Sequence, residues 1–225
     1  MGNFCVRPFG SLSLAVTLLS FSLVPCRADS RVAVWGYDWY VNGGPNQYRP
    51  VQIPTGILTN VVAITGGAGH SLALRQDGTV VAWGDNSYGQ ARVPTGLTDV
   101  VVIAAGAWHN LAVRSDGTVA AWGAGTVVDP GDNNGLQLGQ SMVPAGLTNA
   151  VAVAAGFWHS LALRADGTVV AWGSNNAGQT NVPPGLSNVV AIASGAVFSL
   201  ALKADAPWPY GEGILHTRRQ ISRPD

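Results

Sequence analysis

The sequence predicts an all-β chain built from four copies of one repeated unit, and three observations predict it. The 225 residues include 29 Gly and 13 Pro but only 11% charged residues. Glu212 and Lys203 are the only Glu and Lys, although these residue types usually populate exposed helix faces. Three short sequence markers also recur in the same order along the chain. Strands and turns are therefore expected in place of helices.

The first 28 residues have the pattern of a secretory signal peptide. Arg7 precedes an apolar run from Ser11 to Val24, and the segment closes on the small residue Ala28. A positive start, an apolar centre and a small-residue cleavage site define such signals. The run is shorter than the roughly 20 residues that a membrane-spanning helix needs. We expect cleavage after Ala28; an N-terminal anchor that stays attached is the alternative.

Removal of residues 1–28 changes the chemistry of what remains. Both cysteines, Cys5 and Cys26, lie in that segment, so residues 29–225 contain no thiol and no Cys-based zinc site. Without the segment's two arginines, 10 basic residues face 12 acidic ones, a formal charge of −2. No basic stripe for nucleic acid and no polybasic patch for an anionic membrane is present. We expect a secreted or periplasmic protein that binds neither.

Internal repetition is the strongest signal in residues 29–204, and residues 205–225 form a divergent tail. A Gly lies three residues before His70, His109 and His159, and Phe198 takes the His position in a fourth copy, at spacings of 39, 50 and 39 residues. A Pro marker and a Trp-Gly marker accompany each copy. The Trp positions, which we expect in the core, are Trp35, Trp83, Trp122 and Trp172.

Each copy reads as four short strands. In the second copy, residues 100–104 form a β-branched run, residues 109–114 alternate, and residues 118–122 are apolar again. Asp116-Gly117 supplies the two positive-φ positions of a type I′ hairpin turn. A fourth short strand is predicted after the Trp-Gly marker, as at residues 89–93 of the first copy. Such a unit, apolar on both faces, must be covered by its neighbours. The sequence predicts a β-propeller, or a partial propeller, of about four four-stranded blades.

The repeated segments resemble a known family. They read Gly-x-x-His-Ser-Leu-Ala-Leu, Asp-Gly-Thr-Val-Val-Ala-Trp-Gly and Asn-x-x-Gly-Gln. This pattern is similar to the regulator-of-chromosome-condensation repeat, in the compact form of bacterial proteins such as the secreted, propeller-type β-lactamase inhibitory proteins. The resemblance covers residues 31–204. It implies a ring that usually has more blades than four, with one face that binds a protein.

The two ends of the repeat region complement each other. Residues 31–36 supply a third strand with no first or second strand before it. Residues 189–193 and 198–203 supply first and second strands, and residues 205–207 then lack the Gly of the next hairpin turn. We predict that the N-terminal strand completes the last blade, which closes the ring or stabilises an arc. A truncated gene product is the alternative.

One face of the propeller is the predicted binding face. In an up-and-down blade the first and third connections leave by one face, and both insertions, residues 37–47 and 124–138, lie there. Loops on a rigid scaffold carry binding, and aromatic anchors dominate interface energetics. Packing of the two turn tryptophans between neighbouring blades is the alternative. The candidate binding residues are Tyr37, Trp39, Tyr40, Tyr88, Trp108 and Trp158.

The repeated histidines favour a structural role over a metal site. His70, His109 and His159 occupy one equivalent position per blade, so a single metal ion with bonds of about 2 Å cannot usually reach all three. The repeated Asp residues belong to turns, and no Ser lies in a nucleophile-elbow context. We expect hydrogen bonding within the fold, with no metal, no cofactor and no catalytic residue.

These observations predict a non-enzymatic exported binding module that recognises a protein, with a glycan as the alternative ligand. A structural repeat fragment that functions only on self-assembly is the next alternative. An extracellular enzyme comes third. Guanine-nucleotide exchange, which the resemblance to the founding family member implies, conflicts with the predicted export and the acidic chain.

Overall fold

The computed structural model describes residues 58–126 and 137–204, together with residues 32–33, 37–38, 49–50 and 54. These residues contain thirteen strands and no helix. Accordingly, nothing in the described ranges is a helix long and apolar enough to cross a membrane. The predicted signal peptide, most of both insertions and the tail from residue 205 lie outside the described residues.

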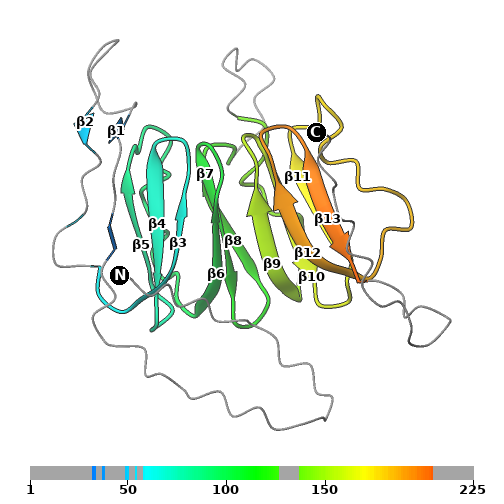
Figure 1. The fold of residues 1–225 in the computed structure, drawn as a ribbon, viewed down its shortest axis with the longest axis horizontal. Helices are drawn as coiled ribbons and strands as arrows, with labels where there is room; N and C mark the ends of the chain where they lie inside the picture. The colour runs from blue at the N-terminus through cyan, green and yellow to red at the C-terminus, as the bar shows by residue number, and fades with distance from the viewer. Residues whose placement is uncertain are drawn as a thin grey trace, which may run out of the picture.

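The strands form four successive antiparallel sheets, which we call blades 1 to 4 (Figure 1). A separate pair, β1 (Tyr37–Asp38) with β2 (Arg49–Pro50), precedes them. Blades 1 and 2 consist of β3 (Val61–Gly66), β4 (His70–Arg75) and β5 (Val80–Gly84), then β6 (Val100–Ala105), β7 (His109–Arg114) and β8 (Val119–Gly123). Blades 3 and 4 consist of β9 (Ala150–Ala155), β10 (His159–Arg164) and β11 (Val169–Gly173), then β12 (Val189–Ser194) and β13 (Ser199–Lys203).

The Asp-Gly hairpins differ from the predicted type I′ turn. Gly117 has a positive φ of 80°, but Asp116 has not. The Asp116 carboxylate instead accepts hydrogen bonds from the backbone N–H of Thr118 at 2.8 Å and from its hydroxyl at 2.6 Å. This Asx-type arrangement keeps Asp116 out of the left-handed region and gives a longer loop with a single left-handed Gly.

The fourth strand expected at residues 89–93 is absent from the described sheets, and blades 1 to 3 have three strands each. Gly89 has a positive φ of 80° and donates to the Asn86 carbonyl, and its own carbonyl accepts from Arg92. The segment is therefore a pair of turns. Its buried Gln90 directs its carbonyl oxygen at side chains of the next blade, so that oxygen does not pair with a strand.

The hydrophobic core lies between blades. Leu111 and Val113 of β7 pack with Ala162 of β10 and Trp172 of β11 in one cluster. An equivalent cluster joins blades 1 and 2. Because burial of a Leu or Val side chain contributes about 1.5–3 kcal/mol, each blade depends on its neighbour. The repeat chain is therefore stabilised one interface at a time.

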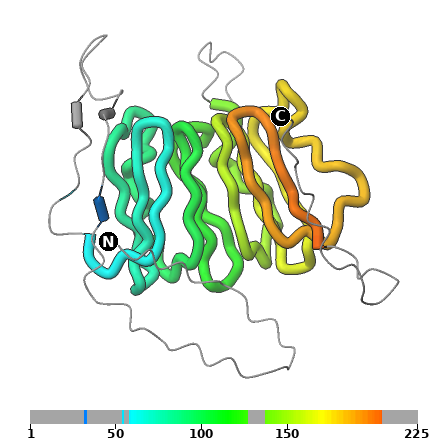
Figure 2. The backbone as a smooth tube through the Cα atoms, in the orientation of Figure 1, coloured from blue at the N-terminus to red at the C-terminus, as the bar shows by residue number. Residues whose placement is uncertain are grey.

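The blades stand in a row from blade 1 to blade 4 (Figures 1 and 2). Contacts run from β3 to β6, from β6 to β9 and from β9 to β12. Among the described strands β13 pairs only with β12, and residues 32–33 belong to no strand. The fold is thus an all-β partial propeller. The predicted addition of residues 31–36 to the last blade of the same chain is not formed in the described residues.

Candidate binding face

The turn before each repeated His lies beside the loop that follows the third strand. Backbone N–H groups of Asp85, Ala124 and Ser174 donate to the carbonyls of Gly69, Trp108 and Trp158, at 2.7 to 2.8 Å. The Asp-Gly turns lie at the other end of the blades, where the Gly117 carbonyl accepts from Ala150. Topology therefore places the turns and loops of the first end on one face, which we call the aromatic face.

Three aromatic rings from neighbouring blades meet on the aromatic face. Trp108, in the β6–β7 turn, stacks on Trp158, in the β9–β10 turn, with centroids 6.0 Å apart and planes at 24°. Phe157 contacts both rings edge to face, at 6.3 Å and 5.4 Å. Both indoles are half-buried, while Phe157 is 44% exposed. The two tryptophans thus pack between blades, and the rings that they fix support an exposed Phe.

Phe157 was not among the predicted residues. The repeat alignment contains the signal that could have found it, because the equivalent position in the other copies is Ala68, Ala107 or Ala196. Ala107 is buried, whereas the larger side chain at Phe157 projects from its turn. At this position, the difference between Phe157 and the Ala of the other copies indicates the exposed ring better than a recurring aromatic does.

The remaining predicted face residues are only partly placed. Tyr88 is half-buried in the loop after β5, where its backbone N–H donates to the Gln90 side chain at 2.8 Å. Tyr37 lies in β1, and only its backbone is described. Trp39 and Tyr40 lie outside the described residues. The site that the structure brings together is therefore Trp108, Phe157 and Trp158.

Each repeated His joins its own blade to the next one. His70 Nε2 lies 2.7 Å from Asn110 Oδ1, and His109 Nε2 lies 2.9 Å from Ser160 Oγ. His159 Nε2 and Ser199 Oγ are 3.1 Å apart. No group of three or more His, Cys, Asp or Glu side chains is placed to hold a metal ion in the described part of the chain.

The acceptor side chains continue the network to a repeated Gln. The Ser160 hydroxyl donates to the Gln140 carbonyl at 2.8 Å, so His109 must donate its Nε2–H to Ser160. The Trp172 indole N–H donates to the same carbonyl at 2.9 Å. One Gln carbonyl therefore accepts from two side chains of the following blade.

The same bonds occur one blade earlier. Asn110 and Trp122 both donate to the Gln90 carbonyl, at 2.8 and 3.1 Å. Trp83, Trp122 and Trp172 are 5–7% exposed, whereas Trp35 lies outside the described residues. The described members of this Trp set are thus core residues, and Trp122 and Trp172 also bond between blades.

A family model for the Regulator of chromosome condensation (RCC1) repeat matches residues 61–90, 100–127 and 150–179. The matched segments contain the strands of blades 1, 2 and 3 and include the Trp-Gly position of each. Residues 61–179 of this chain contain three regulator-of-chromosome-condensation repeats. Blade 4, which has Phe198 in place of the repeated His, lies outside the matched RCC1 segments.

Solved structures, among them yeast RCC1, share this fold. Yeast RCC1 (Prp20) bound to Kap60 has a TM-score of 0.57 at 23% identity, over 75% of this chain and 49% of that one. Prp20p from Saccharomyces cerevisiae has a TM-score of 0.54 at 24% identity, over 68% and 45%. Human WBSCR16 has a TM-score of 0.50 at 24% identity, over 72% and 51%. This chain spans about half the length of these proteins.

Burial keeps the histidines of the RCC1 repeats neutral. Desolvation, and then the neighbouring His70 and His159, lower the pKa of His109 to about 3. Burial also lowers the pKa of His70 and of His159, although their hydrogen bonds act in the opposite direction. These imidazoles are therefore uncharged donors at neutral pH.

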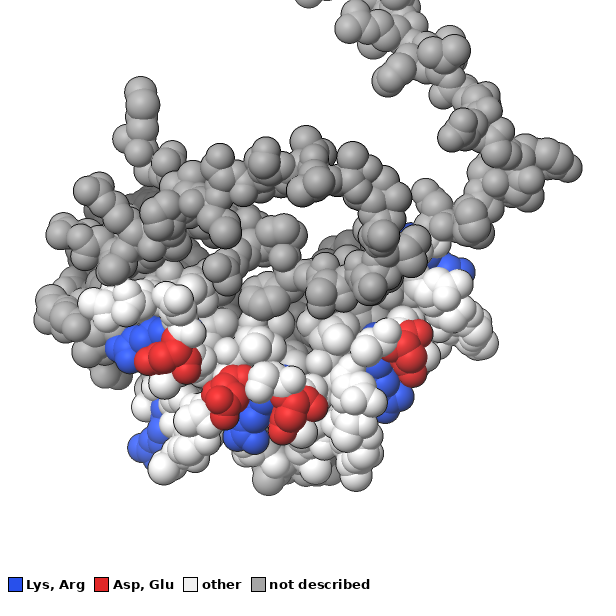
Figure 3. All heavy atoms as spheres, turned by 90° about the horizontal axis from the view of Figure 1, so that it is seen from below, with Lys and Arg blue, Asp and Glu red and all other residues white. Residues whose placement is uncertain are grey.

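The opposite end of the blades has mixed charge. Arg75, Arg114 and Arg164 each end a second strand, next to an Asp-Gly turn. Figure 3 shows acidic and basic side chains close together on this end, among the residues that it colours. In each turn, hydrogen bonds from the Thr two residues later lower the pKa of the Asp, and the neighbouring Arg adds to the effect. This end therefore offers no patch of a single sign over the described residues.

Proposed function

We propose that this protein is a non-enzymatic, exported binding module that recognises another protein through the aromatic face. The observation that carries the proposal is the cluster of Trp108, Phe157 and Trp158. Two stacked indoles hold an exposed phenyl ring in place, so little side-chain freedom is lost when a partner covers it. Rigid aromatic anchors of this kind are enriched among residues that dominate interface energy.

The solved relatives support a protein partner as the ligand class. Yeast RCC1 (Prp20) was solved bound to Kap60, and the study of Prp20p concerned its binding to Gsp1p and histones. These are partners of those proteins. What we transfer to this chain is the use of an RCC1-repeat propeller as a protein-interaction scaffold.

The proposal includes the absence of an enzymatic role. It is supported by the hydrogen bonds that the repeated Asp and His side chains make within the fold. The repeated Asp side chains accept hydrogen bonds inside their own turns, as Asp116 does from Thr118. The repeated His side chains are buried and bonded to the next blade. Because these side chains are engaged in hydrogen bonds that stabilise the fold, we do not expect them to act as catalytic acids or bases.

The binding proposal is tested by capturing proteins from the extracytoplasmic fraction of the source cells and titrating each candidate, once purified, against the chain. Phe157→Ala is the main variant, because a 44% exposed side chain can be removed at little cost to the fold. We expect it to weaken binding by about tenfold or more, since a hot-spot truncation costs about 2 kcal/mol. Val151→Ala, in β9 and 50% exposed, is the matched control.

Two outcomes would contradict the proposal. Unchanged affinity of the Phe157→Ala protein would exclude the aromatic face as the binding site. Retention on a cell-wall polysaccharide, with no purified protein bound, would replace the protein partner by a glycan. The Trp108→Ala/Trp158→Ala double variant is read only alongside its thermal melt, because these rings also pack between blades.

Export is proposed from residues 1–28 alone. Mass measurement of the protein recovered outside the cytoplasm should give a chain that starts at Asp29. A full-length mass there, or retention in the membrane fraction, would favour the uncleaved anchor.

A further inference from the structure

The free face of blade 4 exposes positions that are buried in every other blade. Leu200 of β13 is 57% exposed, but its repeat equivalents Leu72, Leu111 and Leu161 are at most 1% exposed. Those three are covered by the blade that follows them. Leu202, 63% exposed, differs from its equivalents in the same way. The free face of blade 4 therefore has the composition of an interface between blades.

The free face of blade 1, which no preceding blade covers in the described residues, also exposes a position that is buried or packed in the other blades. Ile64 of β3 is 60% exposed, whereas its equivalent Val153 in β9 is 8% exposed. The equivalent in β6, Ile103, packs against the cluster that contains Leu72 and Leu74 of the preceding blade. Ile64 is thus placed to receive two Leu side chains from a blade in front of it. Leu200 and Leu202 are the residues that blade 4 would bring.

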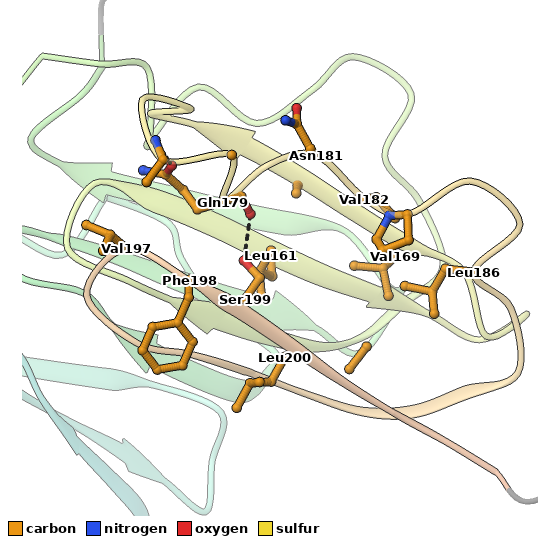
Figure 4. Close-up of a pocket in the computed structure, with 15 residues that line it drawn as sticks. Leu161, Val169, Gln179, Asn181, Val182, Leu186, Val197, Phe198, Ser199 and Leu200 are labelled. Carbon is orange, nitrogen blue, oxygen red and sulfur yellow. Dashed lines mark hydrogen bonds between the residues drawn. The ribbon is translucent and has the colours of Figure 1, made fainter.

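Over the described residues, blade 4 has two strands, whereas blades 1 to 3 have three each. In blade 3 the third strand brings the Trp172 indole to the Gln140 carbonyl. In blade 4 the equivalent Gln179 carbonyl accepts the Ser199 hydroxyl at 2.7 Å, and no third strand follows in the described residues. A groove of about 370 Å³ opens beside these two residues. In Figure 4, Ser199 points toward Gln179, while Phe198 and Leu200 point away from it.

A segment of this chain matches the missing strand. The third strands of blades 1 and 3 read Val-Val-Ala-Trp-Gly, and residues 32–36 read Val-Ala-Val-Trp-Gly. Residues 32–33 lie at the blade 1 end of the row, and blade 4 lies at the other end (Figure 2). The described residues of the segment thus lie at the opposite end of the row from blade 4, which favours a second copy as the donor of the strand.

We propose that two copies of this chain associate head to tail. Blade 4 of one copy covers blade 1 of the other, so that Leu200 and Leu202 pack against Ile64. Residues 31–36 of the copy that supplies blade 1 add the third strand to β13 of the copy that supplies blade 4, and their Trp35 occupies the groove beside Gln179. The contact continues the interface that already joins blades 1 to 4, and it does not depend on the aromatic face.

A ring of two copies is the smallest assembly that covers both free faces. A head-to-tail contact that closes with two copies gives each copy two identical interfaces. Closure also leaves neither free face open to further chains.

The test measures the mass of the full chain in solution by sedimentation velocity and light scattering across a concentration series. Ile64→Asp alters the blade 1 face, and Leu202→Asp alters the blade 4 face. Both side chains are exposed in the single chain, so neither substitution should unfold it. Val151→Asp, which changes an exposed residue of an inner blade, is the control, and circular dichroism checks the fold of each variant.

The expected result is a dimer for the wild type and for Val151→Asp, and a monomer for each of the other two variants alone. An equal mixture of Ile64→Asp and Leu202→Asp should form dimers again, because one of its two interfaces is intact. Trp35→Ala should weaken the dimer by about tenfold or more, as loss of a Trp anchor does.

Four results would overturn the proposal. A monomeric wild type would leave residues 205–225 of the same chain, or another protein, to cover blade 4. Dimerisation of either face variant alone would show pairing of like faces. Polymers that lengthen with concentration would exclude closure with two copies. Unchanged dimerisation of Trp35→Ala would exclude the donated strand.

Discussion

Substitution of His109 by Phe should reduce the dependence of stability on pH. Phe is the residue that the fourth copy carries at this position, where its ring lies over Gly195 as the His109 ring lies over Gly106. In the folded chain the pKa of His109 falls to about 3, from an ordinary value of 6.5. Only the unfolded chain therefore takes up this proton between those two values.

The sign and size follow from that difference. A lowered pKa in the folded state means that the stabilisation is complete above pH 6.5 and is lost as the pH falls toward 3. At about pH 5 the loss from this residue is about 1.5 pH units times 1.36 kcal/mol, or about 2 kcal/mol. His70 and His159, whose pKa values are also lowered, add to the total loss in the wild type.

Urea unfolding at about pH 8 and about pH 5 measures the effect. The free energy of unfolding of the wild type should fall between the two conditions by about 2 kcal/mol more than that of His109→Phe. The variant itself should be less stable at the higher pH, since Ser160 loses its partner but still donates to Gln140. An equal fall in both proteins would refute the assignment of a neutral, desolvated imidazole at His109.

Two further substitutions test the interfaces and the turns. Leu111→Ala should lower the free energy of unfolding by about 2–5 kcal/mol in urea titrations, because it opens a cavity between blades 2 and 3; a loss below about 1 kcal/mol would contradict that packing. Gly117→Ala should cost more than Gly96→Ala in thermal melts. Both glycines have a positive φ, but only at Gly117 would a new Cβ meet backbone, 2.9 Å from Asn149 Cα. Equal melting temperatures of the two variants would show that the backbone around Asn149 shifts at little cost to accommodate the new Cβ.

The strands could be predicted from the sequence because their signals are local and repeated. Residues 100–104 and 109–114 correspond to β6 and β7 to within one residue. The missing fourth strand could not be predicted in this way. The local sequence after the Gly-Gln pair resembles a strand. The Gln90 carbonyl instead accepts hydrogen bonds from Asn110 and Trp122 of the next blade, and this long-range contact has no local sequence signal.

The candidate site was predicted in part, for a similar reason. Trp108 and Trp158 follow from topology, because that argument needs only the order of strands and loops. Their stacking distance depends on how far apart two blades stand, which no local pattern encodes. Phe157 could not be predicted from recurrence, because a Phe occupies this position in one copy only and its contact with Trp108 depends on the neighbouring turn.

The spacing of the bonds to the Gln carbonyls determines where this architecture tolerates change. From Gln90 to Trp122, and again from Gln140 to Trp172, the donor lies 32 residues after its acceptor. The extra length of the chain falls instead between Trp122 and Gln140, outside both of these intervals. A loop can therefore be lengthened or exchanged there without a change to the contact between blades. New recognition sequences grafted at residues 127–136 should leave the scaffold as stable as before, and the same freedom is open to natural variation.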